Sequence, residues 1–421
     1  MNPRAKILYV HHGSGMGGAP QLLLKFMQRL DRGCYEPVVW CIRRSSASEL
    51  FEAHGFRVVY NSDVMPFLHI SDGFYGITRL HRVVKMLAGQ RRSHAAARAV
   101  FAEEQPDLIH LNSVVIPGVL RAASRQGCPV VLNVLECLHP GHTGFRRMLI
   151  RTLSRRWADY FVFMLPSERR RWGLEADPRA VTAFDFIDIE SFTVGGDSAA
   201  LRREFNLPEG VPLVGYLGRF TRAKGTHHLL RAAGMLQRAG VPFHLLLVGP
   251  VPETAPATWR ARMKRLYGGS DYIEQLRTII AEECLADRVT FTGERTAVAA
   301  LVSGLDVLAV PFTEPHFSRL CGEAAAAGKP VVAFDIDGPG EEIIDGETGL
   351  LVPPFNEAAL AGKLRYALEH PEWRALVAQR GPAHARDVFA ADVNVAKVFG
   401  LYEQVLEKET GDRRQESGGN P

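Results

Sequence analysis

Residues 213–240 read LVGYLGRFTRAKGTHHLLRAAGMLQRAG and contain a predicted strand, a turn and a helix in immediate succession. The apolar run at 213–217 has the length of a buried strand. The turn at 218–225 is rich in glycine and basic residues, and residues 227–240 repeat leucine and alanine at helical spacing. A strand that leads directly into a helix is the building block of a parallel sheet covered by helices.

The same pattern recurs along the whole chain. Short runs rich in Val, Ile and Leu alternate with helical stretches, which is typical of parallel sheets with helices on both faces. We predict strands in the first half at 6–10, 37–42, 57–60, 108–111, 129–134 and 160–164. In the second half we predict them at 213–218, 243–249, 289–293, 307–311, 330–335 and 349–353. Two such sets predict an α/β protein with two Rossmann-like, doubly wound domains.

A change in composition marks the domain boundary. The segment between residues 192 and 213 carries Gly, Pro and charge and lacks strand character, so we place the boundary near residue 195. The predicted domains are 1–194 and 195–384. A long helical stretch begins near Val377, and its part from about 385 to 408 is expected to pack back on the first domain. The polar tail at 409–421 is expected to be disordered.

Composition excludes several classes of protein. The 421 residues are 46% hydrophobic and 23% charged, with a formal net charge of +4, and nothing in them indicates a nucleic-acid binder. The mildly basic balance suits anionic ligands such as sugar nucleotides, or a weak contact with anionic lipid. The six cysteines lack the spacing of a zinc site or a disulfide framework. We expect a cytoplasmic protein, because no run reaches the length of a membrane span and the first residues lack a signal-peptide pattern.

The first candidate site is the turn GSGMGG at 13–18, which follows a predicted strand and precedes a predicted helix. Such a turn lets the backbone approach a ligand and directs N–H groups toward it. Gly13, Gly15 and Gly18 also match the GxGxxG pattern of dinucleotide-binding domains. An NADP-linked oxidoreductase and a merely tight turn therefore both remain as alternatives.

The second candidate site contains Arg219 and Lys224, which follow the strand at 213–218. They leave its carboxyl end, the edge at which open α/β sheets bind ligands. Two fixed cations there can neutralise a diphosphate and stabilise it as a leaving group. The alternative is a pair of solvated loop charges.

The third candidate site is EPHFSRLCGE at 314–323, between a predicted strand and a predicted helix. A helix that begins near Leu320 presents N–H groups to a phosphate, and the residues of this turn are Ser318, Arg319, Leu320 and Cys321. Glu323, one turn further on, can accept hydrogen bonds from ribose hydroxyls, or it is simply a carboxylate favoured by the helix dipole.

A metal site is the less favoured interpretation of a fourth stretch. Asp335 and Asp337 have the DxD spacing that can hold a divalent metal and a diphosphate. We discount it because the triplet follows a late strand of the second α/β set. We therefore expect neither a metal nor a cofactor.

The order of these motifs resembles the GT-B glycosyltransferases of family 4, the group 1 enzymes that retain anomeric configuration. The resemblance covers nearly the whole chain. It is carried by Gly17 and Gly18, by PDLIHLNS (106–113), by GRFTRAKG (218–225), and by the stretches 314–335 and 337–354. It implies two Rossmann-like domains that face a central cleft, with the donor on the second domain and the acceptor on the first.

The resemblance also implies roles for individual residues. Arg219 and Lys224 would grip the donor diphosphate, and Glu323, the second Glu of the family's E-x7-E pair, would bind the ribose. The first Glu of the pair is absent from its usual place, which Pro315 occupies. Either Glu314 fills that role through a one-residue insertion, which we favour, or His316 takes over part of it.

A departure in the first domain singles out Glu136. Family members often carry a His at the end of a central strand that faces the acceptor, whereas here the strand at 129–134 leads to Glu136.

The predicted function is a retaining, metal-independent transferase of the hexosyltransferase type. It would move a sugar from a nucleotide diphosphate donor to a carbohydrate or lipid-linked acceptor in surface polysaccharide or glycolipid synthesis. Besides the oxidoreductase, the alternatives are a GT-B sugar-nucleotide epimerase and a transferase-like protein that binds without turnover.

Contact with a membrane is a further expectation from the sequence. The basic, amphipathic segment from Phe145 to Trp157 could rest on anionic lipid at the inner face of the membrane, or it is an ordinary helix with one buried side.

Overall fold

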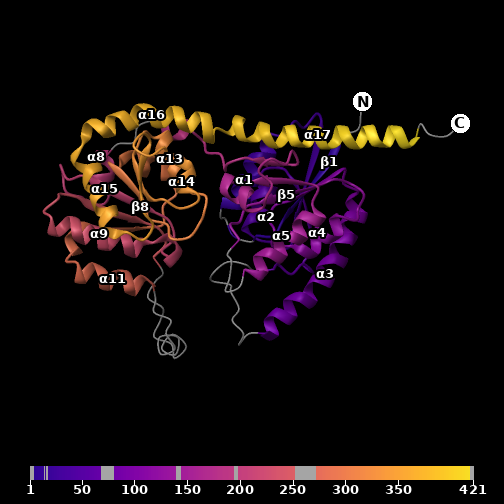
Figure 1. The fold of residues 1–421 in the computed structure, drawn as a ribbon, viewed down its shortest axis with the longest axis horizontal. Coiled ribbons are helices and arrows are strands. Elements are labelled where there is room, and N and C mark those ends of the chain that lie inside the picture. Colours follow the sequence, from indigo (N-terminus) through magenta and orange to yellow (C-terminus); the bar gives the residue numbers. More distant parts are fainter. Residues whose placement is uncertain are drawn as a thin grey trace. The chain divides into compact units, whose positions relative to one another are not determined.

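The computed structural model describes residues 4–13, 15, 18–67, 80–138, 144–193, 198–251 and 272–417. The chain divides into two compact units, each built around its own parallel sheet (Figure 1). Unit 1 comprises Met1–Asp185 and Asn394–Pro421, and unit 2 comprises Phe186–Val393. The division therefore lies earlier than residue 195. The reason is that the apolar residues of α7 (Glu190–Thr193) pack with unit 2, against α12 (Val298–Gly304) and α13 (Arg319–Ala326).

Within the described residues unit 1 contains a seven-stranded parallel sheet in the order β3-β2-β1-β4-β5-β6-β7. Its strands are β1 (Ala5–His11), β2 (Tyr35–Cys41), β3 (Arg57–Tyr60), β4 (Leu108–Leu111), β5 (Val130–Val134), β6 (Tyr160–Phe163) and β7 (Ala180–Thr182). The six strands predicted for this half are confirmed. The sequence did not reveal β7, because a strand of three residues is too short to produce a periodic pattern.

Helices cover the unit 1 sheet. They are α1 (Gly18–Gln28), α2 (Ser46–Ala53), α3 (Leu80–Glu104), α4 (Pro117–Ala123), α5 (Phe145–Trp157) and α6 (Pro166–Arg171). Helix α3 packs against α4, and α4 packs against α5. The approach of α3 to α4 requires Gly118, since a Cβ atom there would lie 2.7 Å from the Gln90 carbonyl oxygen. The Gly118 N–H also donates to Gln90 Oε1 at 3.0 Å, which holds the two helices together.

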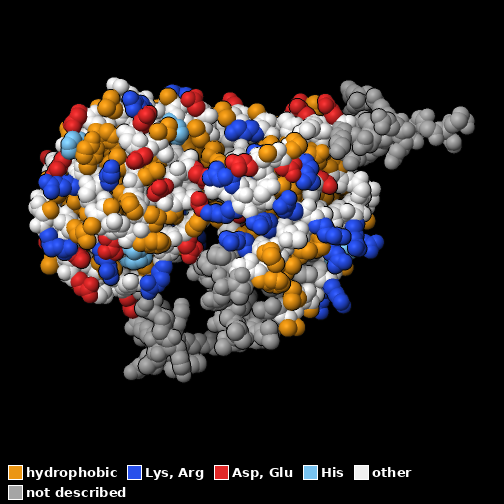
Figure 2. Space-filling view, in the orientation of Figure 1, with side chains coloured by type: hydrophobic (Ala, Val, Ile, Leu, Met, Phe, Trp, Pro, Cys, Tyr) orange, Lys and Arg blue, Asp and Glu red, His pale blue; other side chains and the backbone are white. Residues whose placement is uncertain are grey.

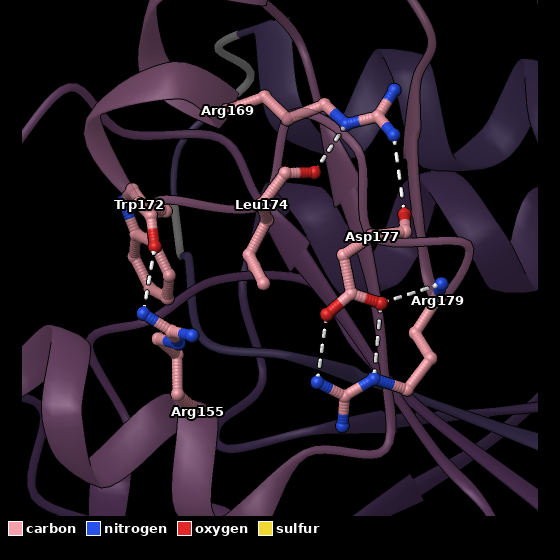
Figure 3. A network of polar contacts seen from close by, with 6 residues as sticks. All are labelled: Arg155, Arg169, Trp172, Leu174, Asp177 and Arg179. Atoms are coloured by element: carbon pink, nitrogen blue, oxygen red, sulfur yellow. Dashed lines mark hydrogen bonds and ion pairs between the residues drawn. The ribbon is translucent and has the colours of Figure 1, made fainter.

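A polar network anchors α5 to the segment that follows α6 (Figure 3). Arg155 of α5 donates to the Trp172 carbonyl oxygen at 3.1 Å. Arg169 donates to the carbonyl oxygens of Leu174 and Asp177, and the Asp177 carboxylate accepts two hydrogen bonds from the Arg179 guanidinium. Arg155 and Arg169 thus donate hydrogen bonds to backbone carbonyls of the irregular segment 172–177.

The C-terminal helix α17 (Ala391–Ser417) returns to unit 1. Its Tyr402 is fully buried, and the Tyr402 Oη lies 2.6 Å from Nδ1 of His110 on β4. The predicted single helix from Val377 is interrupted, because Ala390 adopts an extended conformation between α16 (Pro371–Phe389) and α17. The helix also continues to Ser417, through residues that the sequence assigned to a disordered tail.

Within the described residues unit 2 contains a six-stranded parallel sheet in the order β10-β9-β8-β11-β12-β13. The strands are β8 (Leu213–Leu217), β9 (His244–Val248), β10 (Val289–Gly293), β11 (Val307–Val310), β12 (Val331–Phe334) and β13 (Gly349–Val352). Each was predicted and is confirmed. The remaining elements are α8 (Ser198–Glu204), the 3-10 turn η3 (Arg222–Lys224), α9 (Thr226–Arg238), α11 (Tyr272–Glu282), the 3-10 turn η4 (Ala286–Arg288), α14 (Pro339–Glu342) and α15 (Glu357–Glu369).

The strand orders explain where ligands can bind. In both sheets the chain leaves a central strand, moves to one edge and then crosses back to the other side, and such reversals open a crevice at the carboxyl ends of the strands. No helix among the described residues combines the length and the apolar character needed to cross a bilayer.

The buried pair between Tyr402 and His110 predicts how the end of the chain contributes to stability. Replacing Tyr402 with Phe removes the phenol oxygen and leaves the buried imidazole without this partner. We expect a loss of about 1–3 kcal/mol in the free energy of unfolding, measured by thermal unfolding. The control is Tyr366→Phe on the partly exposed face of α15, which should be nearly neutral. Equal stability of both variants would contradict a stabilising role for this pair.

Candidate functional site

The basic turn of unit 2 is held by a glycine. Gly225 precedes α9 with a φ of +67°, and a Cβ atom there would lie 1.7 Å from the Pro311 carbonyl oxygen. Thr313, which follows β11, donates its N–H to the Ala223 carbonyl oxygen at 2.9 Å. The backbone thus brings the turn after β8 directly against the loop after β11.

Lys224 lies in this contact. Its Nζ atom is 3.6 Å from the centre of the Phe312 ring, close enough for a cation–π interaction. Desolvation and the neighbouring Arg219 lower the pKa of Lys224 to about 7, although the carboxylates of Glu342 and Glu314 act in the opposite direction. Arg219 itself is exposed. The structure therefore brings the two predicted cations close together, with one of them partly withdrawn from water.

The loop after β11 is fixed by a second close approach. Gly338 has a φ of +103°, and a Cβ atom there would lie 2.0 Å from the His316 carbonyl oxygen. The His316 N–H donates to the Asp337 carbonyl oxygen at 3.2 Å. Beside this contact lies a shallow hollow of about 350 Å³, which is lined by Pro315, Asp335, Ile336, Asp337, Gly340 and Glu341.

His316 and Glu314, the two candidates for the displaced first Glu, both lie near the cations. Desolvation and the charges of Lys224 and Arg219 lower the pKa of His316, so its imidazole is neutral around pH 7. The negative charge of Glu314, two residues before His316, raises the pKa of Lys224.

The turn at the start of α13 differs in detail from the prediction. The Ser318 N–H donates to Glu342 Oε1 at 2.8 Å, and the Cys321 N–H donates to the Ser318 carbonyl oxygen at 2.9 Å. Both N–H groups are therefore engaged within the protein. Arg319 and Leu320, at the same turn, are partly exposed.

Glu323 lies one turn into α13 and is buried, with 7% of the residue exposed. Its Oε1 atom is 3.8 Å from Arg319 Nε, an ion pair within the helix. This ion pair restrains the carboxylate within the first turns of α13.

Glu342 is a site residue that the sequence analysis missed. Only 1% of it is exposed, and burial raises its pKa well above the ordinary value. Glu342 accepts a hydrogen bond from the Ser318 N–H, and its charge raises the pKa of Lys224. It therefore connects the stretch 337–354 with the stretch 314–335 and with the turn that carries Lys224. A signal existed in Glu341-Glu342 directly before two isoleucines, because a carboxylate at the edge of an apolar run is unusual.

Unit 1 gathers a different set of groups at the carboxyl ends of its strands. Asn133 Nδ2 donates to Asn112 Oδ1 at 3.0 Å, and Asn112 Nδ2 lies 3.5 Å from His11 Nδ1. Burial lowers the pKa of His11 to about 3 and that of His12 to about 4. These groups are uncharged around neutral pH and can serve as hydrogen-bond donors and acceptors.

Some of these polar atoms can form further hydrogen bonds. Among the described residues, His11 Nε2, His12 Nδ1 and Asn133 Oδ1 are buried without a hydrogen-bond partner. The sequence analysis did not single out these residues. The available signal was a pair of histidines that ends β1 immediately before the glycine-rich turn.

Glu136 completes the unit 1 group. Its carboxylate accepts hydrogen bonds from the Ser113 hydroxyl and from the Val114 N–H, the latter at 3.3 Å. Burial raises the pKa of Glu136 to about 7, although these hydrogen bonds favour the ionised form. The carboxyl group can therefore exchange a proton close to neutral pH, as general acid–base catalysis requires.

The glycine-rich turn is described only in part. Gly18 begins α1, whereas Gly17 lies outside the described residues. The imidazole of His11 lies close to Gly13, since a Cβ atom on Gly13 would be 2.9 Å from His11 Nε2. Within the described part of the chain, no group of three or more His, Cys, Asp or Glu side chains is placed to hold a metal ion.

Comparison with known families assigns both units. Residues 197–384 match the family described as Glycosyl transferases group 1, and residues 17–184 match the Glycosyl transferase 4-like domain.

Individual relatives share about half of the chain. A 2-deoxystreptamine glucosyltransferase of Streptomyces kanamyceticus is 29% identical over 50% of this chain and 50% of its own length. A D-inositol 3-phosphate glycosyltransferase of Stackebrandtia nassauensis is 32% identical over 50% of this chain and 46% of its own. The chain thus spans about half the length of the curated relatives it matches.

Solved structures share the fold over nearly the whole chain. HepE of Anabaena in complex with UDP superposes with a TM-score of 0.73 at 22% identity, over 96% of this chain and 100% of that one. The sucrose-phosphate synthase of Thermosynechococcus elongatus gives a TM-score of 0.69 at 21% identity, over 96% and 100% of the two chains.

The lowered pKa of Lys224 predicts that anion binding depends on pH. Above pH 7 the free lysine is largely neutral, and binding a diphosphate must then take up a proton. The affinity for inorganic pyrophosphate, measured by calorimetry, should therefore fall by up to about tenfold per pH unit above pH 7.

Lys224→Arg is the matched control for this effect. Arginine stays charged throughout the range, and the titration of pyrophosphate itself is common to both proteins. The wild-type affinity should fall more steeply with pH than that of the variant. Identical slopes would show that Lys224 does not titrate on binding.

Proposed function

We propose, from the premise that this chain belongs to the group 1 glycosyltransferases of GT-B fold, that it transfers a sugar from a nucleoside diphosphate donor to an acceptor hydroxyl. The observation that carries the proposal is the pair Arg219 and Lys224, held together at the carboxyl ends of the unit 2 strands. Two adjacent cations repel each other until an anion binds between them. A diphosphate is the anion that such a donor supplies.

The donor binds to unit 2 in this proposal. Arg219 and Lys224 contact the diphosphate, Leu320 and Arg319 contribute from the start of α13, and the buried carboxylate of Glu323 accepts hydrogen bonds from the ribose. HepE, which has a similar fold, was crystallised in complex with UDP, and this supports a nucleotide ligand for unit 2.

The chemical step follows from the placement of these charges. The bond between the anomeric carbon and the β-phosphate oxygen breaks, and the acceptor oxygen bonds to the same face of that carbon. The acceptor proton passes to the departing diphosphate, whose negative charge the two cations stabilise. Attack on that face retains the anomeric configuration, and cationic side chains here take the part that a divalent metal plays in other sugar transferases.

In this proposal Glu314 and His316 hold the transferred sugar. We propose that Glu314 replaces the displaced Glu of the family motif, because its charge acts on Lys224 and a carboxylate can accept hydrogen bonds from sugar hydroxyls. The neutral His316 can donate or accept a further hydrogen bond from the same loop.

The acceptor binds to unit 1 in this proposal. The uncharged cluster of His11, His12, Asn112 and Asn133 suits a polyhydroxylated ligand, since several of its polar atoms lack partners in the described structure. Glu136 would orient the acceptor hydroxyl. The acceptor is a carbohydrate or a lipid-linked sugar of a surface polysaccharide or glycolipid, and a lipid-linked one would bring this cytoplasmic enzyme to the inner face of the membrane.

The names of two relatives indicate other acceptors worth testing. One relative is a D-inositol 3-phosphate glycosyltransferase, and another is a 2-deoxystreptamine glucosyltransferase. An acceptor panel should therefore include both compounds. The family assignment favours transfer over the NADP-linked oxidoreductase, and incubation with donor alone separates transfer from epimerisation or simple binding.

The donor site is tested by Arg219→Ala, Lys224→Ala and Glu323→Ala. We expect each cationic variant to lower the turnover number by about 100-fold or more, as loss of one charge-stabilising group commonly does. Glu323→Ala should mainly raise KM for the donor. Arg222→Ala, from the same basic turn, is the matched control and should retain most activity. Near-normal rates in all three site variants would remove the proposed donor site.

The acceptor site is tested by Glu136→Gln. Because the folded pKa is raised from 4.5 to about 7, the stability contributed by protonated Glu136 is complete below pH 4.5 and is lost as the pH rises through 7. The variant should therefore be more stable than wild type at pH 8 and equally stable at low pH.

The Glu136→Gln variant should lose activity although it gains stability at pH 8. Turnover with acceptor should fall in Glu136→Gln while donor binding stays unchanged, because donor and acceptor bind to different units. A variant that is less stable at pH 8 and fully active would assign Glu136 a purely structural role.

A further inference from the structure

An apolar groove of about 470 Å³ lies on unit 1, and its lining includes none of His11, His12, Asn112, Asn133 and Glu136. One wall is Leu149, Ile150, Leu153 and Trp157 of α5, and the others come from α3, from α4 and from Phe67. Figure 2 shows hydrophobic and basic side chains together over these helices. Gly118 lines the groove at the tight contact of α3 with α4, so its base is rigid.

Three exposed arginines line the rim of the groove. Arg91 projects from α3, Arg121 from α4, and Arg125 from the turn after α4. The described lining contains no Asp or Glu. The groove is therefore positive. Desolvation and the charges of Arg125 and Arg121 lower the pKa of His94, which also lines the groove, so His94 does not add to that charge.

The basic residues at the end of α5 have a different role. Arg155 binds the Trp172 carbonyl oxygen, as Figure 3 shows, and Arg151 binds the Arg171 carbonyl oxygen. These two arginines fix α5 in place. The cations that line the groove are therefore those of α3, of α4 and of the turn after α4, which the sequence-based expectation of lipid contact through Phe145–Trp157 did not include.

Exposed apolar side chains extend the groove along two helices. Leu87 of α3 lies in the groove wall with 53% of its surface exposed, and Val84, one turn earlier, is 58% exposed. On α5, Met148 and Phe145 are 51% and 59% exposed. Four large apolar residues on neighbouring helices are more than scattered surface hydrophobics would provide, and such patches mark interaction sites.

We propose that this groove binds an anionic phospholipid of a membrane. The phosphate would pair with the guanidinium groups of Arg91, Arg121 and Arg125, and an acyl chain would lie against Leu149, Leu153 and Trp157. A free phosphate would leave the apolar wall unused, whereas a phospholipid matches both the charge of the rim and the character of the wall. The inference goes beyond sugar transfer and stands independently of it.

The first test is co-sedimentation of the full chain with vesicles made of equal parts of phosphatidylcholine and phosphatidylglycerol. Replacing Arg91, Arg121 and Arg125 together with Gln should weaken binding about a hundredfold, since each arginine near an anionic surface strengthens binding severalfold. The control is the triple variant Arg277→Gln, Arg365→Gln and Arg380→Gln, which removes the same charge from exposed positions of unit 2. It should bind almost as well as wild type.

The second test locates the acyl chain. Vesicles with brominated acyl chains quench a tryptophan that they touch, and Trp40, Trp172 and Trp373 are buried. In a Trp259→Phe background, which removes the tryptophan outside the described residues, quenching should occur and should disappear when Trp157→Phe is added. The sugar-transfer activity plays no part in either readout, so a failure here is distinct from a failure of the proposed function.

The outcomes decide the proposal in both directions. Selective loss of binding in the groove variant, together with quenching of Trp157, supports it. Equal loss in the two triple variants would reduce the effect to general charge and overturn the site. The proposal would also be overturned if the protein bound equally well to vesicles of pure phosphatidylcholine or bound to no vesicle. Quenching that persists without Trp157 would overturn it as well.

Discussion

The candidate donor site depends on two positive charges that the fold holds together at the ends of buried strands. Lys224 is partly withdrawn from water and lies close to Arg219, and both effects disfavour its charged form, whereas the contact with the Phe312 ring favours it. The protein tolerates this cost because Gly225 and Gly338 fix the two loops where no other residue would fit. In the proposed function, a bound diphosphate offsets the repulsion between these two positive charges.

The two units present binding groups of different character. Unit 2 presents the cations Arg219 and Lys224, with the buried Glu342 near Lys224, whereas the strand ends of unit 1 present neutral imidazoles, amides and one carboxyl group of raised pKa. Charged groups suit a leaving diphosphate, and neutral groups suit a polyhydroxylated acceptor. This difference supports the division between donor and acceptor that we propose.

Local pattern was a good guide to the elements and a weaker one to their limits. Every predicted strand is present, because an apolar run of four or more residues has few alternatives in an α/β chain. The three-residue β7 and the extended Ala390 escaped notice because neither disturbs the periodicity of its surroundings. The predicted N–H groups of Ser318 and Cys321 proved to be engaged, since their partners are a distant carboxylate and a helix turn that periodicity does not specify.

By itself the sequence determined the α/β class, the two strand–helix sets and the motifs that carry Arg219, Lys224 and Glu323, because these follow from periodicity and spacing within short segments. Only the tertiary structure decided which of these groups meet. Burial and long-range contacts set the pKa of Lys224 and of Glu136. The fold also brought Glu342 close to Lys224 and Ser318, and it placed Arg91 and Arg121 on one groove. Such properties depend on residues far apart in the chain, and a local pattern contains no information about their distance in space.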